Sequence, residues 1–279
     1  MMRELSDHQK EEVADLLREQ TGGEDRLSLS SAEYIADITD LSVRAVELFA
    51  LGRGILPVRY EKNLGTVGME GQRRLLENTA AVIGLGGLGG HVVESCARVG
   101  IGMLLMVDPD RFEETNLNRQ LLAVEESLGQ QKAEAAIERV RQVNPGVVCI
   151  GAIRRVQQLE ADFFGRCSVV FDCLDSVAAR HTLAEKCAQA DTVLVHGAIA
   201  GWSGQVALCR PGAGLMEKLY GGQKRGLERR QGNLPFTAAV AANLMVARAV
   251  PVLLGEDLPD RDEVLFFDLR DNEWQTVEV

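Results

Sequence analysis

A G-x-G-x-x-G pattern, typical of a phosphate-binding turn, is formed by Gly84, Gly86 and Gly89. The apolar run Ala80–Ile83 before it predicts a buried strand, and the periodicity of Leu88–Val99 predicts a helix. Glycine lets the backbone approach a ligand closely, and free N–H groups at a helix N-terminus favour anionic oxygens. The pattern therefore predicts that phosphate groups bind at the start of this helix.

A second apolar run ends at Asp108, 19 residues after Gly89. A carboxylate in this position can accept hydrogen bonds from ribose hydroxyls. Strand, glycine turn, helix, strand and acid in this order predict an adenosine nucleotide as ligand. On these residues alone the nucleotide would most often be NAD, so an NAD-dependent dehydrogenase stays open as a minor alternative.

A polar loop, Asp110–Gln120, follows Asp108 where a simple dinucleotide enzyme would continue directly into a helix. Asn116, Arg119 and Gln120 are close enough in sequence to reach one ligand. The guanidinium of Arg119 has a planar fork of donors that suits phosphate oxygens. The alternative interpretation of Arg119 is a solvated loop arginine.

Lys132 is predicted to lie in the first turn of a helix that opens at Ser127 or Gly129 and ends near Val143. The helix macrodipole disfavours a positive charge at this end. A lysine kept there is expected to face an anion, although an exposed lysine in a first turn costs little.

The stretch Asp172–Ser176 ends another predicted strand at the carboxyl edge of the sheet, where ligands bind in open parallel sheets. Asp175 could hold Mg²⁺ between phosphates, because hard oxygen ligands suit that ion. The alternative is that Asp175 or Ser176 only caps the helix that follows.

Strands and helices alternate from Thr79 onward, which predicts an α/β fold with a doubly wound, mostly parallel sheet and helices on both faces. The expected elements are strands 79–83, 102–107, 147–151, 168–173, 192–196 and 205–209, helices 88–99, 130–142, 176–189 and 236–254, and a C-terminal β hairpin of strands 264–268 and 274–278. The Gly/Lys/Arg-rich segment 211–233 exceeds ordinary connections, which indicates a mobile lid or binding segment.

Residues 1–56 are predicted to form a small N-terminal helical appendage, and residues 57–279 the nucleotide-binding domain. The appendage has a charged helix at 7–20 and two short helices within 31–51, which resemble a helix-turn-helix that could enter a DNA groove. Residues 1–58 carry twelve acidic against six basic residues, a net charge of −6. A packing or protein-contact role is therefore favoured over DNA binding.

The composition, 46% hydrophobic and 25% charged over 279 residues, suits one large core with a small appendage. A net charge of −11 disfavours broad attraction to nucleic acid or to a membrane surface. The start of the chain is too charged for a signal peptide, and no run of about 18 apolar residues is apparent, so we expect a cytoplasmic location. The six cysteines include no C-x-x-C pair and are expected to be buried free thiols.

Together these motifs resemble the HesA/MoeB/ThiF family, the bacterial relatives of ubiquitin-activating enzymes, over about residues 59–279. The shared motifs, in family order, are Arg59-Tyr60, Gly71-Gln72, the glycine turn 84–89, Asp108-x-Asp110, Asn116-Leu-Asn-Arg119-Gln120, Gly129-Gln-Gln-Lys132, Asn144-Pro145, Asp172-Cys-Leu-Asp175 and His196-Gly197-Ala198. The resemblance implies a ThiF-type, Rossmann-like fold and ATP as the nucleotide. It also implies adenylation of the C-terminal glycine carboxylate of a ubiquitin-like sulfur-carrier protein, ThiS- or MoaD-like, with release of pyrophosphate.

The resemblance also implies roles for single residues. The residues implied to bind ATP are Gly84, Gly86, Gly87, Gly89, Asp108, Asp110, Asn116, Arg119, Gln120, Lys132, Leu174 and Asp175. Arg119 and Lys132 would stabilise the phosphates during catalysis, and Asp175 would bind Mg²⁺. Lys62 departs from the family pattern, because relatives commonly have at this position an arginine that reaches the phosphates of the neighbouring subunit. Lys62 could supply the charge without the bidentate fork. The resemblance implies a homodimer in which this segment completes the partner's site.

The sequence lacks two cysteine features that some family members have. Without C-x-x-C pairs, no structural zinc site is expected. Segment 211–233 contains no cysteine, and Cys187 and Cys209 are the nearest candidates for a covalent intermediate with the carrier. We expect adenylation without such a step, because each of these cysteines is interpreted as a buried small hydrophobic residue. The adenylation itself needs no nucleophilic dyad, since an ionised carboxylate attacks phosphorus directly. A tRNA threonylcarbamoyladenosine dehydratase and a non-catalytic nucleotide-binding scaffold stay open as alternatives.

Overall fold

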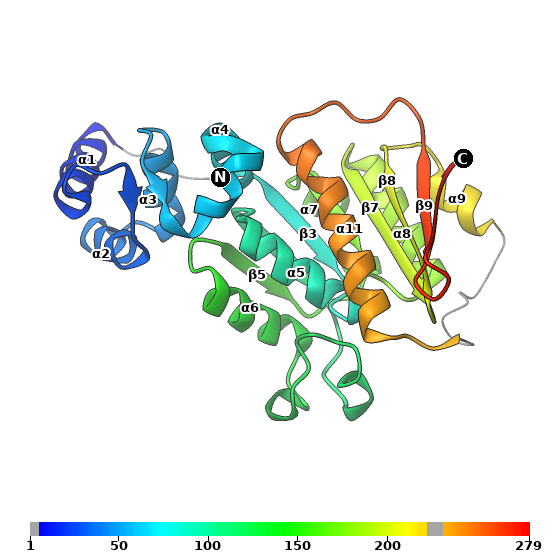
Figure 1. Ribbon diagram of the computed structural model, residues 1–279. Helices are drawn as coiled ribbons and strands as arrows, with labels where there is room; N and C mark the ends of the chain where they lie inside the picture. Colours follow the sequence, from blue (N-terminus) through cyan, green and yellow to red (C-terminus); the bar gives the residue numbers. More distant parts are fainter. Residues whose placement is uncertain (1–5, 222–230) are drawn as a thin grey trace.

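The computed structural model describes residues 6–221 and 231–279. An eight-stranded sheet forms its centre, in the order β10-β9-β8-β7-β6-β3-β4-β5 (Figure 1). The parallel strands are β3 (Thr79–Ile83), β4 (Met103–Val107), β5 (Val148–Ala152), β6 (Val169–Asp172) and β7 (Val193–Ala200). The antiparallel strands are β8 (Ser203–Cys209), β9 (Glu263–Asp268) and β10 (Glu273–Glu278). The last two form the hairpin expected from the sequence.

Helices cover both faces of this sheet (Figure 1). One face packs against α5 (Gly87–Val99), α6 (Lys132–Val143) and α11 (Pro235–Leu253). The other packs against α7 (Ala161–Phe164), α8 (Val177–Gln189) and α9 (Leu215–Tyr220). The inner strands are buried on both faces, which explains why they read as continuous apolar runs. The predicted doubly wound, mostly parallel α/β fold is confirmed.

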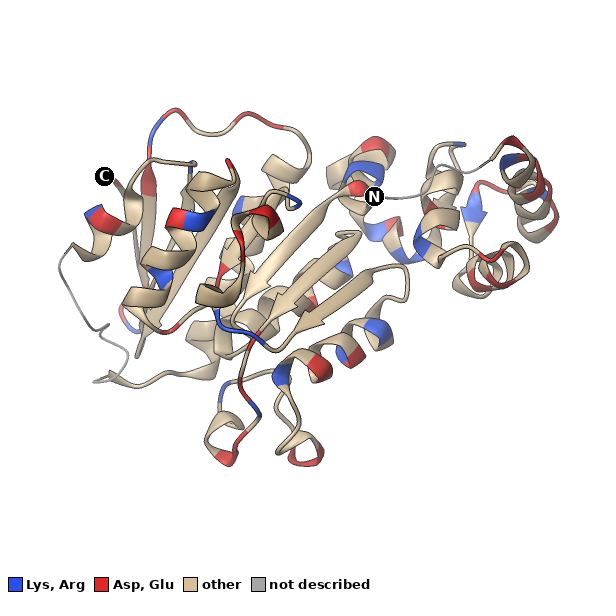
Figure 2. Cartoon of the chain, turned by 180° about the vertical axis from the view of Figure 1, so that it is seen from behind, with Lys and Arg blue, Asp and Glu red and all other residues tan. Residues whose placement is uncertain are grey.

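The N-terminal residues form three helices, α1 (Asp7–Thr21), α2 (Leu29–Thr39) and α3 (Val43–Leu51), around a small core of their own. A short parallel pair, β1 (Arg26–Leu27) with β2 (Leu56–Pro57), closes this unit. Acidic residues mark α1 and α2 along their length (Figure 2).

The second helix of the helix-turn-helix resemblance, α3, is packed inside the protein. Arg44 is buried, and its guanidinium donates hydrogen bonds to the carbonyls of Leu76 and Glu77 at the end of α4. Val46, Leu48, Ala50 and Leu51 are buried as well. These faces of α3 are therefore not available to a DNA groove.

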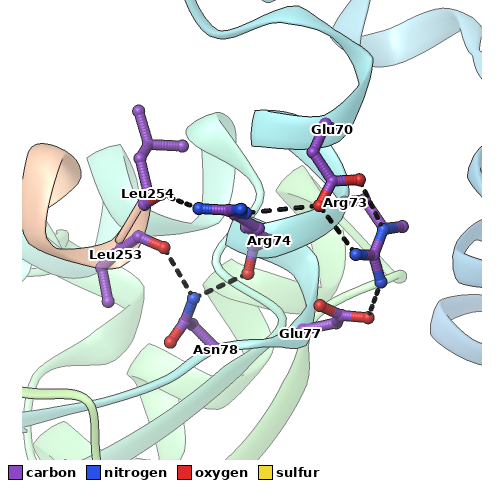
Figure 3. Close-up of polar contacts among 7 residues, drawn as sticks. All are labelled: Glu70, Arg73, Arg74, Glu77, Asn78, Leu253 and Leu254. Carbon is purple, nitrogen blue, oxygen red and sulfur yellow. Dashed lines mark hydrogen bonds and ion pairs between the residues drawn. The ribbon is translucent and has the colours of Figure 1, made fainter. Parts of the chain in front are cut away.

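Helix α4 (Leu64–Glu77) joins the N-terminal unit to the sheet and holds the end of α11 (Figure 3). Arg74 donates a hydrogen bond to the carbonyl of Leu254, and the amide of Asn78 donates to the carbonyls of Arg74 and Leu253. Asn78 stands immediately before β3. The start of the central strand and the end of α11 are thereby fixed to one another.

Two expectations need correction. Segment 211–233 contains α9 and is therefore not a loop throughout, and its residues 222–230 lie outside the described part of the chain. The expectation that the chain has no run of about 18 apolar residues is wrong, because α11 is 19 residues long with a mean hydropathy of 1.6, enough by length and composition to cross a membrane. Part of α11 packs on the sheet, with 44% of that window buried, as a core helix would.

Candidate active site

A pocket of about 430 Å³ opens at the carboxyl ends of β3, β4 and β6. The chain adds β4 and β5 on one side of β3 and β6 on the other, so the strand order reverses at this place. Ligands bind at such a switch point in open α/β sheets. Of the residues predicted to bind ATP, those that line the pocket are Gly84, Gly86, Gly87, Asp108, Asp110, Arg119, Gln120, Lys132, Leu174 and Asp175.

The glycine turn links β3 to α5. Gly84 has φ +91°, and a Cβ there would lie 2.7 Å from the carbonyl oxygen of Cys173. A Cβ at Gly89 would lie 1.8 Å from the carbonyl oxygen of Gly84. Gly89 therefore allows the helix to pack on the turn and does not itself line the pocket. The N-cap of α5, Gly86, supplies no side-chain hydrogen bond, which leaves the first N–H groups without a capping side chain.

The carboxylate of Asp108, directly after β4, stabilises this turn by hydrogen bonds. One of its carboxylate oxygens accepts a hydrogen bond from the Leu85 N–H at 2.6 Å, and the other accepts from the Asp110 N–H at 2.8 Å. Burial raises the pKa of Asp108, while the two backbone hydrogen bonds oppose that shift. Each oxygen keeps a second lone pair, so a carboxylate that fixes the loop can still accept from a ligand hydroxyl.

Lys132 is the first residue of α6, whose N-cap is Gln131. The prediction that the helix opens at Ser127 or Gly129 is wrong, because Gly129 has φ +82° and Glu125–Ser127 forms a separate 3-10 turn. Lys132 is buried, with its Nζ 3.9 Å from Asp110 Oδ2. A buried cation in a pocket wall is suited to an anionic ligand.

A second basic pair lines the pocket and was missed from the sequence. Arg154 and Arg155 follow the end of β5. Their position in the sequence could have indicated them, because they follow a parallel strand closely, as the residues of the predicted site Asp172–Ser176 do. With Arg119, Lys132 and Arg180 they give the pocket five basic residues.

Asp175 is exposed and lines the pocket. Within the described residues its carboxylate makes no hydrogen bond or ion pair. The N-cap of α8 is Ser176, which makes no side-chain capping bond, so the capping alternative for Asp175 is wrong. An unpaired carboxylate facing a basic pocket is suited to a bound cation.

Three of the predicted site residues do not line this pocket. Gly89 supports the turn, and Asn116 accepts a hydrogen bond from the Glu113 N–H at 3.0 Å and so shapes the loop. Lys62 is exposed on the 3-10 helix Val58–Asn63. Tyr60 of that helix packs against Gly100 at the amino end of β4, opposite to the pocket.

The six cysteines are free thiols; five are buried as expected, whereas Cys149 is only partly buried. Burial raises the pKa of each of them. Burial raises the pKa of Cys187 to about 12. Such a thiol is protonated at neutral pH and is a poor nucleophile.

A model of the ThiF family matches residues 60–279. The ThiS adenylyltransferase of Escherichia coli is 27% identical over 79% of this chain and 90% of its own. The SAMP-activating enzyme E1 of Haloferax volcanii is 31% identical over 78% and 84%. A sulfur carrier protein adenylyltransferase of Thermus thermophilus is 31% identical over 79% and 86%.

Solved structures show the same fold at lower identity. Escherichia coli MccB with ATP superimposes with a TM-score of 0.66 over 88% of this chain and 82% of its own, at 16% identity. Escherichia coli TcdA, a tRNA N6-threonylcarbamoyladenosine dehydratase, gives 0.59 over 71% and 95%, at 23% identity. The chain therefore belongs to the ThiF family, and it is an adenylyltransferase.

Proposed function

We propose that this protein uses ATP and Mg²⁺ to adenylate the C-terminal glycine carboxylate of a ubiquitin-like sulfur-carrier protein, releasing pyrophosphate. One observation carries the proposal: a single pocket combines an uncapped helix N-terminus, five basic residues and the unpaired carboxylate of Asp175. Relatives named as adenylyltransferases of sulfur-carrier proteins point to the same substrate class.

The pocket suits a nucleoside triphosphate. An added Cβ would lie 3.7 Å from Gln120 Nε2 at Gly86 and 3.7 Å from Arg119 Cγ at Gly87, so side chains at these glycines would fill the space beside the helix N-terminus. The Oε1 atom of Gln120 is buried without a hydrogen-bond partner among the described residues. A hydroxyl or amino group of a ligand would satisfy it.

The chemistry needs alignment and positive charge. The carrier carboxylate attacks the α-phosphorus of ATP, a new P–O bond forms, and the bond to the β-phosphate breaks with its electron pair leaving on pyrophosphate. Arg119 and Lys132 are placed to stabilise the charge that grows on the leaving oxygens. Asp175 would hold Mg²⁺, which when bound neutralises phosphate charge. Asp108 would orient the ribose.

We further propose that the active form is a homodimer in which Lys62 serves the partner's pocket. Lys62 lies away from the pocket of its own chain, which fits a role in trans. Exposed apolar side chains also gather on the segment between β4 and α6, the two loops that project from the body in Figure 1. These side chains are Leu117, Leu121, Val124 and Leu128. A surface of this kind suits a subunit contact.

Exchange of labelled pyrophosphate into ATP tests the proposed reaction. Wild-type protein should catalyse exchange with a carrier that ends in Gly-Gly, and it should fail with the same carrier lengthened by one alanine, because the reacting carboxylate is then displaced. Absence of exchange with every Gly-Gly carrier, in protein that binds ATP by calorimetry, would reject the proposal.

Paired variants separate an enzyme from a scaffold. Lys132→Ala should abolish exchange, while Arg141→Ala, which removes an exposed cation from the last turn of the same helix, should not. Asp175→Ala should likewise differ from Asp257→Ala, an exposed acid outside the pocket. A non-catalytic scaffold would keep its role in cells with Lys132→Ala. A tRNA-modifying enzyme would instead retain tRNA at moderate salt and release it steeply as salt rises.

A further inference from the structure

A closed ring of hydrogen bonds adjoins the pocket wall that carries Asp175, and its members Leu174 and Arg180 line the pocket themselves. It includes both peptide groups of Leu174, the residue before Asp175. Its side chains come from β6, α8, β7 and α9 and are all buried: Asp172, Arg180, His196 and Tyr220.

The first half of the ring runs from Leu174 to Tyr220. The Leu174 N–H donates to Asp172 Oδ1 at 3.1 Å. The other oxygen, Asp172 Oδ2, lies 2.8 Å from His196 Nδ1, and both side chains are fully buried. On the far side of the imidazole, His196 Nε2 lies 3.0 Å from the Tyr220 hydroxyl.

The second half returns from Tyr220 to Leu174. Arg180 Nη1 donates to the Tyr220 hydroxyl at 2.9 Å. The same guanidinium donates to the carbonyl oxygen of Leu174 from Nη2 at 2.7 Å and from Nε at 3.1 Å. Gln205 Nε2 donates a further bond to the Tyr220 hydroxyl at 2.9 Å. Both the N–H and the carbonyl of Leu174 are thus held by buried side chains.

One assignment of protons satisfies every member of the ring. A neutral His196 carries its proton on Nδ1 and donates to Asp172, and its bare Nε2 accepts from Tyr220, with the Gln205 amide nitrogen also 3.0 Å away as a second donor. The Tyr220 oxygen in turn accepts from Arg180 and Gln205. Burial lowers the pKa of His196, in agreement with a neutral imidazole. A buried polar network that is fully satisfied is rigid.

We propose that this ring is a positioning device, with His196, Tyr220 and Arg180 acting through Leu174 to fix Asp175 at the pocket wall. Asp175 has no partner for its own side chain among the described residues, so the backbone before it determines where the carboxylate lies. The consequence for metal binding rests on the proposed function, in which Asp175 holds Mg²⁺. Since Tyr220 is the last residue of α9, the ring also ties α9 to the metal-binding loop.

Tyr220→Phe removes the hydroxyl and opens the ring while keeping the aromatic ring in place. Hydrogen–deuterium exchange of the amides at 173–177 should become about tenfold faster, because two or three buried hydrogen bonds are lost. The matched control is Thr192→Val, which removes another buried hydroxyl, bonded to the carbonyl of Phe164 at 3.0 Å, and should leave this exchange unchanged. Arg180→Lys, which keeps the charge but loses the guanidinium fork, should act as Tyr220→Phe does.

Calorimetric titration of ATP at several Mg²⁺ concentrations gives the second measurement. Tyr220→Phe should raise the Mg²⁺ concentration for half-maximal ATP binding about three- to tenfold, with ATP affinity restored at saturating Mg²⁺. Unchanged amide exchange in both Tyr220→Phe and Arg180→Lys would overturn the proposal. Faster exchange with unchanged Mg²⁺ dependence would overturn it as well, because the ring would then stabilise the loop without placing Asp175.

Failure of the proposed function is distinguishable from failure of the ring. If Asp175→Ala kept the wild-type Mg²⁺ dependence of ATP binding, Asp175 would not be the metal residue, and the metal-binding consequence would be rejected. If wild-type protein bound Mg²⁺ and ATP normally but gave no pyrophosphate exchange, only the assigned reaction would fail, and the two measurements on Tyr220→Phe would still decide on the ring.

Discussion

Arg59 and Glu47 form an ion pair inside the protein, with 3.2 Å between Arg59 Nε and Glu47 Oε1 and the glutamate side chain 1% exposed. It joins α3 to the 3-10 helix Val58–Asn63, which leads into α4. Burial raises the pKa of Glu47 to about 7, although the positive charge of Arg59 works in the opposite direction. Desolvation therefore outweighs the attraction between the two charges.

The raised pKa predicts a pH-dependent stability. In the folded state Glu47 keeps its proton up to about pH 7, whereas in the unfolded chain it loses it near pH 4.5, so its contribution to stability is fully present below pH 4.5 and is lost as pH rises through 7. The loss amounts to roughly 3 kcal/mol. Urea unfolding at pH 5 and pH 7.5 should show that Glu47→Gln removes most of this dependence. The control Glu61→Gln, which opens the more exposed pair with Arg26, should retain it.

The missed arginines should contribute to nucleotide affinity. Arg154→Ala is expected to weaken ATP binding about tenfold, because a hydrogen-bonding cation is removed from the wall of the pocket in which we propose that ATP binds. Calorimetry at 50 mM and 200 mM salt should show a shallower salt dependence than wild type. Arg141→Ala serves as the matched control; an equal effect of both substitutions would indicate general electrostatics in place of a specific contact.

The exposed apolar residues between β4 and α6 should hold the dimer together. Val124→Asp places a charge on this surface and is expected to yield monomers in analytical ultracentrifugation. Ile150→Asp changes an equally exposed residue, on the edge strand β5, and should leave the dimer intact. Loss of the dimer with Ile150→Asp alone would place the contact on the edge strand.

Mixed dimers test the action of Lys62 in trans. Lys62→Ala and Asp175→Ala subunits, each inactive alone, should regain activity when mixed. Random pairing makes about half of the dimers mixed with one intact site of two, so about one quarter of wild-type activity is expected. A confirmed mixed dimer without activity would show that Lys62 does not complete the partner's site.

An exposed aromatic pair, Trp202 and Phe236, follows the pocket-lining residues Ile199 and Asn233, each three residues further along the chain. The rings of Trp202 and Phe236 are 4.9 Å apart, with 44% and 41% of each residue exposed. Trp202→Ala is expected to raise the KM for the carrier about five- to tenfold without changing the Kd for ATP. Trp274→Ala, an exposed tryptophan on β10, is the control that should leave both values unchanged.

Asn78 should contribute more to the free energy of unfolding than Arg73, which forms ion pairs on α4 (Figure 3). Its amide bonds the carbonyls of Arg74 and Leu253, so Asn78→Ala is expected to cost about 2 kcal/mol of unfolding free energy. Arg73→Ala removes only surface pairs with Glu70 and Glu77 and should cost less than about 1 kcal/mol. Urea denaturation of both variants gives the comparison, and the reverse order of costs would show that the α4–α11 junction is not held by Asn78.

Short-range patterns in the sequence were enough to predict the helices and strands of the sheet and several residues of the pocket wall. Gly84 and Asp108 stand directly after strands, and Asp175 stands three residues after β6, where the periodicity of the sequence changes. The start of α6 was missed because a distant contact decides it: the Lys132 N–H donates to the carbonyl of Asp110 across the loop. No sequence pattern marks that pairing.

The hydrogen-bonded ring around Leu174 could not be predicted from the sequence, because it too depends on contacts between distant residues. Asp172 and His196 are 24 residues apart and meet only because β6 and β7 are paired, and Tyr220 reaches them from the end of α9. Sequence reasoning placed Asp172 and His196 in family motifs and gave them no partner. Partners that depend on strand pairing become visible only once the sheet order is known.

The buried side chain of Arg44 has a practical consequence for any shortened form of this protein. A chain starting at residue 57 would leave the carbonyls of Leu76 and Glu77 without their donors and would uncover Tyr60, which packs with Leu48 and Leu51. The sequence pattern changes at residue 56, yet residues from both sides of this boundary pack in one hydrophobic cluster. Such a truncation should expose apolar surface near the start of β3 and so promote aggregation. The chain that includes residues 1–56 is therefore the better choice for expression.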